Sequence, residues 1–170
     1  MKASKLIVLR GPSGSGKSTV AKMLFESATR KIALIDQDHY RFIFKPAGGG
    51  SKPNSDSIHK MIKSDTLIAL KDGYDVILEG ILSVKSYSKV LDEIFVKHPE
   101  GNFMFYFDIS LEETLKRHKS RAEKFPDFGE KEMREWYPVA HRSNHRLEQI
   151  IPEAFSAEKA FKFIKRTSKL

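Results

Sequence analysis

The stretch from Gly11 to Thr19 constrains this chain more than any other part of its sequence. It reads Gly-Pro-Ser-Gly-Ser-Gly-Lys-Ser-Thr and fits the pattern G-x-x-x-x-G-K-[ST]. A glycine-rich backbone can curl so that successive N–H groups point into one hollow, which suits a polyphosphate. An apolar run over residues 5–9 precedes the stretch, and apolar residues at helical spacing follow it up to Ala28. The sequence therefore predicts a strand, a phosphate-binding loop and a helix.

The pattern gives each residue of the loop an expected role. The Lys17 ammonium is expected to reach the β- and γ-phosphates, and the Ser18 hydroxyl to take one coordination position on Mg²⁺. The helix that begins near Gly16 presents its positive end to the phosphates. The residues expected to bind a nucleotide are Gly11, Pro12, Ser13, Gly14, Ser15, Gly16, Lys17, Ser18 and Thr19.

Apolar strands alternate with helical patterns along the rest of the chain, which is typical of an α/β protein with a parallel sheet. Strands are predicted over residues 5–9, 31–36, 74–80, 102–108 and 148–151. Helices are predicted from Gly16 onwards, over 37–44, 57–70, 82–96 and 130–142, and after Ser110 (with Glu113 as its capping-box partner) and Ser156. This pattern predicts one three-layer α/β/α domain over residues 1–170, with ligands bound at the carboxyl ends of the strands.

Composition narrows the classes of partner and location. The chain has 170 residues, of which 30 are Lys or Arg and 22 are Asp or Glu, giving a formal charge of +8. This charge favours an anionic partner, but the basic residues are spread along the chain, so a phosphate site on a solvated surface is favoured over a dedicated nucleic-acid groove. No stretch approaches the roughly 20 apolar residues of a membrane span. With no cysteine and no signal-peptide pattern, we expect a cytoplasmic protein.

Acidic residues follow the second predicted strand. An aspartate at a strand end opposite the loop can accept the proton of a hydroxyl during phosphoryl transfer, and we assign this role to Asp38. Arg41 lies one helical turn beyond Asp38, where it can hold the substrate or keep the carboxylate ionised. The structural alternative is that Asp36 caps the short helix and that Asp38 and Arg41 form an exposed ion pair.

Two acids are candidates to bind the same Mg²⁺ ion as the Ser18 hydroxyl. Asp36 is adjacent to its strand, and Glu79 ends the third predicted strand. An acid in this position of a nucleotide-binding α/β protein commonly holds Mg²⁺ through water. The alternatives for Glu79 are contact with the substrate and support of a neighbouring residue.

Arg117 and Arg121 are four residues apart, so they project from the same face of their predicted helix. Cations supplied from a lid can stabilise the charge on a phosphoryl group in transit, and we predict such a lid over about residues 117–137. The alternative is that the two arginines complement the helix dipole. Trp136, in the same region, is predicted to stack on a base, to cover the site or to pack in a half-buried position.

Together these motifs resemble the small P-loop kinases. The loop, followed after one helix by Asp36-Gln37-Asp38-His39-Tyr40-Arg41, is similar to polynucleotide 5′-hydroxyl kinase domains, zeta-toxin-like kinases and chloramphenicol phosphotransferase-like enzymes. The resemblance spans residues 5 to about 125. It implies the strand order 2-3-1-4-5, a catalytic Asp38, a substrate-contacting Arg41 and lid arginines at 117 and 121.

The favoured hypothesis is an enzyme that transfers the γ-phosphoryl group of ATP, with Mg²⁺, to a hydroxyl acceptor. The acceptor would be a small metabolite, an antibiotic or a nucleic-acid 5′ end. One alternative is a P-loop ATPase or nucleotide-dependent switch that has no phosphoryl acceptor. Another is a nucleic-acid-binding module that uses ATP only structurally, for which binding would depend steeply on salt.

Overall fold

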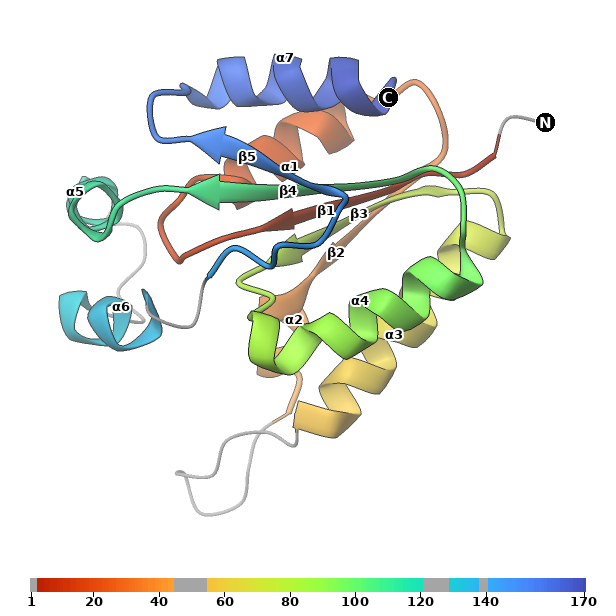
Figure 1. The fold of residues 1–170 in the computed structure, drawn as a ribbon, viewed down its shortest axis with the longest axis horizontal. Helices are drawn as coiled ribbons and strands as arrows, with labels where there is room; N and C mark the ends of the chain where they lie inside the picture. Colours follow the sequence, from red (N-terminus) through yellow and green to blue (C-terminus); the bar gives the residue numbers. More distant parts are fainter. Residues whose placement is uncertain (1–2, 45–54, 121–128, 138–140) are drawn as a thin grey trace.

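A parallel sheet forms the centre of the molecule. The computed structural model describes residues 3–44, 55–120, 129–137 and 141–170 (Figure 1). Within these ranges the strands run in the order β2-β3-β1-β4-β5, and all neighbouring strands are parallel. Their bounds are β1 Leu6–Arg10, β2 Ile32–Asp36, β3 Asp75–Gly80, β4 Asn102–Asp108 and β5 Glu148–Pro152. The predicted α/β architecture and the strand order that the resemblance implied are both confirmed.

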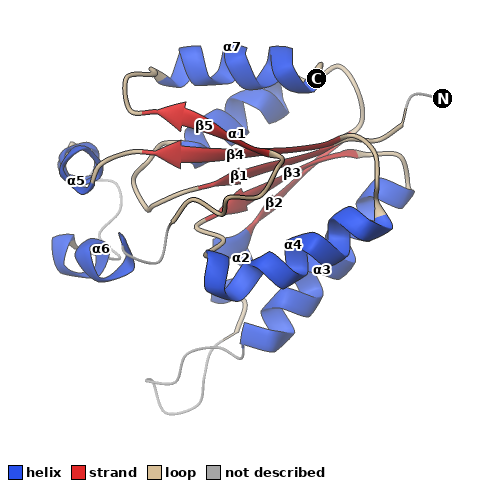
Figure 2. Ribbon diagram, viewed as in Figure 1, coloured by secondary structure: helices blue, strands red, loops and turns tan. Residues whose placement is uncertain are grey.

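Helices cover both faces of this sheet, so the molecule has three layers (Figure 2). Helices α1 and α7 lie on one face and α3 and α4 on the other, while α5 and α6 lie beyond the carboxyl ends of the strands. None of the helices in the described ranges has the length and apolar composition of a membrane span. The helix bounds are α1 Lys17–Glu26, α2 Gln37–Phe42, α3 Ser55–Lys71, α4 Val84–Lys97, α5 Leu111–Lys119, α6 Glu130–Trp136 and α7 Ala157–Ser168.

The central strands are buried on both faces, which explains their continuous apolar sequences. Alternate residues of β1 point to opposite sides of the sheet. Leu6 and Val8 belong to the core cluster under α3 and α4, and Ile7 and Leu9 to the cluster under α1 and α7. Because β1 is paired on both edges, the loop that follows it begins in the middle of the molecule.

Two local predictions were wrong. Helix α6 ends at Trp136 rather than at residue 142; Tyr137 is its C-cap, and the next residue in the sequence, Pro138, has no N–H to continue the helix. The capping box at α5 is only half formed. The Ser110 hydroxyl accepts from the Glu113 N–H at 3.3 Å, but the Ser110 N–H donates to Glu153 at 2.7 Å. The Glu113 carboxylate is used elsewhere, as described below.

Candidate active site

The phosphate-binding loop lies between the two halves of the sheet. It connects β1 to α1, and β1 has β3 on one side and β4 on the other. In sheets of this kind the strand order reverses here, which opens a crevice at the carboxyl edge. The Ser15 hydroxyl oxygen in this loop is buried and has no hydrogen-bond partner among the described residues. An unpaired buried hydroxyl in a glycine-rich loop fits a site whose polar ligand is an anion.

Lys17 is the first residue of α1, and its side chain folds back into the phosphate-binding loop. The residue is 7% exposed, and its ammonium donates a hydrogen bond of 3.0 Å to the Pro12 carbonyl oxygen. Burial lowers the pKa of Lys17, and the negative charges of Glu79, Asp38 and Asp36 act in the opposite direction. An ammonium group that has one backbone partner keeps two N–H donors for phosphate oxygens.

The residues expected to serve the metal meet at the same edge of the sheet. Asp36 and Glu79 are register partners on β2 and β3, and the Ser18 hydroxyl donates to the Glu79 carboxylate. Burial raises the pKa of both acids. The described residues contain no cluster of three or more His, Cys, Asp or Glu side chains that could hold a metal. These oxygen ligands fit Mg²⁺, which usually keeps several waters and relies on substrate phosphates.

The raised pKa of Glu79 gives the protein a specific pH dependence. A folded-state pKa above the unfolded value contributes stability below the unfolded pKa, and this stability is lost as pH rises through the folded value. Glu79→Gln keeps the hydrogen-bonding shape without titrating. We therefore expect its free energy of unfolding, relative to wild type, to rise between about pH 4 and about pH 7 in Mg²⁺-free urea titrations. An unchanged difference at the two pH values would contradict this explanation.

The segment after β2 forms the contacts that the structural alternative predicted. Asp36 caps α2 by accepting from the Asp38 N–H at 2.8 Å, and Asp38 pairs with Arg41 at 3.1 Å. The Asp38 and Arg41 side chains are 54% and 42% exposed. Asp36 and Asp38 nevertheless both act electrostatically on Lys17, so these contacts hold the two acids beside the loop. Their roles in catalysis stay predictions.

Helix α2 is held in place by hydrogen bonds of two of its own side chains, Gln37 and Tyr40, to which the sequence interpretation gave no role. The Gln37 side-chain oxygen accepts from the Leu82 N–H at 3.0 Å, and the Tyr87 hydroxyl is also hydrogen-bonded to Gln37. Gln37 lies directly over Gly80, where an added Cβ would be 2.4 Å from its oxygen. Farther along α2, the Tyr40 hydroxyl donates to Asp65 of α3 at 2.7 Å. A usable signal for Gln37 was its position between Asp36 and Asp38.

A cavity of about 420 Å³ lies beside α2, on the β2–β3 side of the loop. We call it the α2–α4 cavity. Arg41 is the only lysine or arginine among the described residues that line it, and the aromatic side chains in its wall include Trp136. Burial raises the pKa of another, Tyr87, to about 12, so its hydroxyl stays protonated at neutral pH. The lining residues are Gln37, Arg41, Ser55, Ile58, His59, Ile81, Ser83, Ser86, Tyr87 and Trp136.

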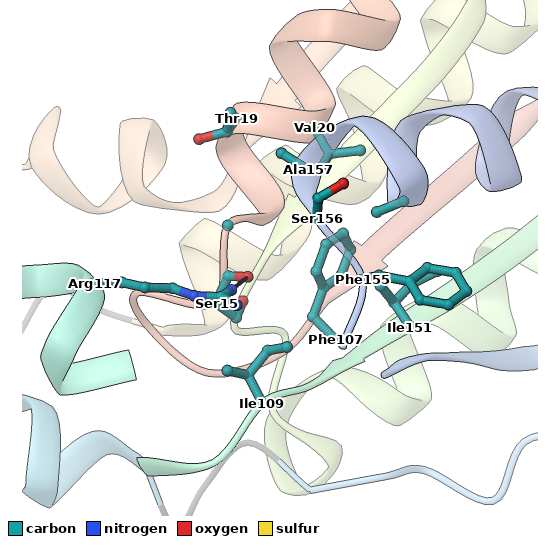
Figure 3. A pocket seen from close by; sticks show the side chains of 12 residues that line it. Ser15, Thr19, Val20, Phe107, Ile109, Arg117, Ile151, Phe155, Ser156 and Ala157 are labelled. Atoms are coloured by element: carbon teal, nitrogen blue, oxygen red, sulfur yellow. Dashed lines mark hydrogen bonds between the residues drawn. The ribbon is translucent and has the colours of Figure 1, made fainter. Parts of the chain in front are cut away.

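A second cavity, of about 260 Å³, lies on the β4–β5 side of the loop (Figure 3). We call it the β4–β5 cavity. Ser15 and Arg117 stand at one end, and the walls are mostly apolar, with Phe107 and Phe155 among the side chains shown in Figure 3. An apolar recess beside a phosphate loop suits the flat base and the sugar of a nucleotide. The remaining lining residues are Gly16, Thr19, Val20, Ile109, Ile151, Ser156, Ala157 and Ala160.

Arg117 reaches the loop from α5. Its Nη1 donates to the Ser15 carbonyl oxygen at 3.0 Å, and its Nε donates to the Glu113 carboxylate at 2.8 Å (Figure 3 shows the first contact). These two bonds hold the guanidinium between the loop and the β4–β5 cavity. Arg121, the other predicted lid arginine, lies outside the described residues, as does the 121–128 part of the predicted lid.

Gly14 lies where helices α5 and α6 pack against the phosphate-binding loop. Its φ angle is +76°, and an added Cβ would lie 3.0 Å from both the Met133 methyl carbon of α6 and the Thr114 carbonyl oxygen of α5. Gly14→Ala therefore combines an unfavourable backbone angle with a steric conflict. Gly73→Ala is the matched control, because Gly73 has a φ of +81° and no atom within 4 Å of such a Cβ.

We expect Gly14→Ala to lower the free energy of unfolding by about 1–2 kcal/mol more than Gly73→Ala does, as measured by urea denaturation. The difference between the two losses in free energy of unfolding measures how tightly α5 and α6 pack against the loop. Equal losses would mean that the two helices do not pack against Gly14 in solution.

Comparisons with known proteins agree with this geometry. The family model described as AAA domain (AAA_33) matches residues 6–138. A guanylate kinase of Caldanaerobacter subterraneus subsp. tengcongensis is 28% identical over 150 residues, covering 71% of this chain. The chain spans 66% of that relative's length, and 56% of the length of a second guanylate kinase, from Mycoplasma genitalium.

Solved structures show the same fold. The Mycobacterium tuberculosis APS kinase CysC in complex with AMPPNP and APS has a TM-score of 0.72 and 17% identity, with 100% of both chains covered. A gluconokinase from Sinorhizobium meliloti 1021 has a TM-score of 0.70 and 17% identity, covering 99% of this chain and 96% of its own. The fold is therefore that of the small P-loop kinases.

Proposed function

The chain belongs to the AAA_33 family of AAA domains, and we propose that it is a kinase that transfers the γ-phosphoryl group of ATP to a hydroxyl acceptor. One observation carries the proposal: the phosphate loop lines one cavity, and Asp38, whose charge acts on the lysine of the loop, pairs with Arg41, which lines a second. A nucleotide switch needs one ligand cavity next to the loop. Transfer between two substrates needs two.

The donor half of the proposed site uses the loop and the β4–β5 cavity. The loop N–H groups and Lys17 bind the polyphosphate, and the apolar recess of Phe107, Ile109 and Phe155 takes the nucleoside. Arg117 lies between these two parts and can turn its guanidinium from the Ser15 carbonyl towards phosphate oxygens. The AMPPNP complex of the APS kinase relative supports a nucleotide in a protein of this fold.

The acceptor half uses the α2–α4 cavity. Asp38 accepts the proton of the acceptor hydroxyl while the new O–P bond forms and the bond from the γ-phosphorus to the ADP oxygen breaks. The proton ends on the Asp38 carboxylate and the bonding electron pair leaves with ADP. Arg41, held 3.1 Å from Asp38, keeps that carboxylate oriented and can contact a polar group of the acceptor.

Charge neutralisation completes the proposed mechanism. Lys17 and Arg117, with Arg121 as a further candidate, oppose the negative charge on the phosphoryl oxygens in the transition state. When bound, Mg²⁺ supplies further neutralisation of the phosphate charge. Ser18 would hold it directly, and Asp36 and Glu79 through water.

Acceptor-dependent ADP formation tests the proposal. Purified protein is incubated with ATP, Mg²⁺ and pools of sugars, nucleosides, hydroxylated antibiotics and 5′-hydroxyl oligonucleotides, and products are sought by mass spectrometry as a gain of one phosphoryl group. Formation of a phosphorylated acceptor is the expected result. ADP formation at one rate with and without every pool would favour a plain ATPase. The names of the related kinases refer to different acceptors, among them the nucleotide guanylate, so a pool of nucleoside monophosphates is included as well. A cytoplasmic location is part of the same proposal.

A further inference from the structure

Helix α5 brings a paired carboxylate and guanidinium to the phosphate-binding loop. The Arg117 Nε donates to the Glu113 carboxylate at 2.8 Å, and both side chains are 26% exposed. The two residues are four apart, so they lie on the same face of the helix. The Arg117 Nη1 then reaches the Ser15 carbonyl oxygen at 3.0 Å. The guanidinium is therefore held on two sides, by its own helix and by the loop.

The Glu113 carboxylate can hold Arg117 because its expected partner is already occupied. In a capping box, the glutamate at the third helical position accepts from the N–H of the capping residue, which here is Ser110. That N–H instead donates to Glu153 at 2.7 Å, and the Ser110 hydroxyl is also hydrogen-bonded to Glu153. Glu153 lies between the end of β5 and the start of α7. A residue 43 positions along the chain therefore leaves Glu113 to Arg117.

The bond from Arg117 to Ser15 fixes one peptide of the loop. In a planar trans peptide, the carbonyl oxygen and the following N–H point to opposite sides. Because Arg117 holds the Ser15 oxygen, the Gly16 N–H points away from the guanidinium. Gly16 precedes α1 with a φ of +95°, and glycine has wide conformational freedom. A bond that fixes this peptide therefore arranges the loop before phosphate arrives.

The Arg117 guanidinium also keeps donors for a ligand. It has five N–H groups, and the contacts with Glu113 and Ser15 use two of them. The other three have no protein partner among the residues that the structure describes. Arg117 lines the β4–β5 cavity, and Figure 3 shows its side chain reaching Ser15 at one end of that cavity. A phosphate oxygen can therefore be bound while Glu113 still holds Nε.

We propose that Glu113 is a positioning residue, which holds the Arg117 guanidinium where it meets the phosphates of the donor nucleotide. Glu153 keeps Glu113 available for this role by taking the Ser110 N–H. The expected effect on kcat rests on the proposed kinase function, whereas the contact and its effect on nucleotide affinity do not. The alternative is that Glu113 and Arg117 only stabilise α5, as an ordinary ion pair four residues apart does.

The Nε–H signal of Arg117 in ¹⁵N NMR spectra tests the contact without any reaction. It is assigned as the signal lost in Arg117→Lys. Held by a carboxylate, this N–H should exchange slowly with water and give a sharp signal near neutral pH. Glu113→Met keeps the side-chain length and the helix propensity but has no acceptor oxygen, so the signal should broaden beyond detection.

Two further variants show whether the acceptor oxygen is responsible. Glu113→Gln keeps an oxygen that can accept from Nε, so it should retain the signal at a shifted position. Glu112→Met removes the same charge from the same first turn of α5, at an exposed position. It should leave the Arg117 signal as in wild type.

Glu153→Ala tests the remote part of the proposal. This change frees the Ser110 N–H, which then competes with Arg117 for the Glu113 carboxylate, so the Arg117 signal should broaden relative to wild type. Glu158→Ala, which removes an exposed acid paired with Lys162 on α7, should leave the signal unchanged. An unchanged signal in Glu153→Ala would contradict the role given to Glu153.

Nucleotide binding and turnover test the effect on the site. Relative to Glu112→Met, Glu113→Met should weaken ATP binding by about threefold to tenfold in calorimetry and lower kcat by about 10–10²-fold. The larger effect on kcat is expected because a misplaced cation loses most where the phosphoryl charge develops. In an Arg117→Met background, adding Glu113→Met should have no further effect, because its action passes through Arg117.

The outcomes separate this proposal from the proposed function. If Glu113→Met keeps the Arg117 signal, binds ATP like Glu112→Met, or loses as much in the Arg117→Met background as alone, Glu113 does not position Arg117 and the proposal is wrong. If the signal and the ATP affinity fall as expected but no acceptor is phosphorylated, the proposed kinase function is wrong and the role of Glu113 in nucleotide binding stands.

Discussion

Asp38→Asn is expected to lower kcat for phosphoryl transfer by about 10²–10⁴-fold while leaving the affinity for ATP nearly unchanged. The amide keeps the shape of the carboxylate but cannot take the proton of the acceptor hydroxyl. The capping bond of α2 uses the Asp36 side chain and the Asp38 backbone, so the fold loses only an exposed ion pair. Such a pair contributes roughly 0–1 kcal/mol. Steady-state rates with the acceptor found in the screen, and nucleotide titrations, measure the two effects.

Asp56→Asn provides the comparison for Asp38→Asn. Asp56 is also an exposed helical aspartate in an ion pair, with Lys60 at 2.7 Å. Asp56→Asn should lose no turnover, because Asp56 lies at the start of α3 and, unlike Asp38, is not among the acids whose charge acts on Lys17. Full turnover in Asp38→Asn would remove the general-base assignment and leave the acceptor proton to solvent or to the phosphate.

Lys17→Met is expected to lower kcat by at least about 10²–10³-fold and to weaken nucleotide binding as well. Unlike Asp38, Lys17 is predicted to contact phosphate in the ground state and in the transition state, so both KM and kcat should change. Methionine matches the length of the lysine stem and removes the ammonium that the Pro12 carbonyl holds at 3.0 Å. Nucleotide titration calorimetry and single-turnover rates separate the two contributions.

Lys22→Met on the same helix controls for the change in α1. The Lys22 side chain is 73% exposed, and its ammonium lies 3.8 Å from the Glu26 carboxylate, one helical turn away. We expect normal nucleotide affinity and turnover from this variant. If Lys17→Met behaved in the same way, the ammonium would not act on phosphate and the role of the loop would need another explanation.

The fold was largely predictable because its strands are short apolar runs bounded by charged or turn residues. Strand β4 matches the predicted 102–108, and the start of β3 was misplaced by one residue. The predicted end of α6 was wrong because the helix was continued past Pro138, a residue that lacks the N–H a helix needs. The capping box at Ser110 failed for a reason that local sequence does not contain: Glu153, 43 residues away, takes the Ser110 N–H.

Some residues of the candidate site could likewise be predicted from the sequence, and others could not. Lys17, Asp36 and Glu79 could be predicted to meet because each follows or ends a parallel strand, and such strands all end at one edge. Gln37 and Tyr87 could not. Their contact depends on how α2 packs against α4, and the second partner of Gln37 is Leu82, a buried leucine with a φ of +43° that no local pattern indicates.

The central position of β1 has a consequence for which parts of the protein can unfold locally. Strand β1 is hydrogen-bonded on both edges and wholly buried, whereas α5 and α6 lie at the rim. Backbone amides of β1 should therefore exchange with deuterium only in global unfolding, and those of α5 and α6 in smaller local openings. Strand β1, which leads into the phosphate-binding loop, then stays folded while α5 and α6 open locally. Ligands can therefore enter and leave without global unfolding of the protein.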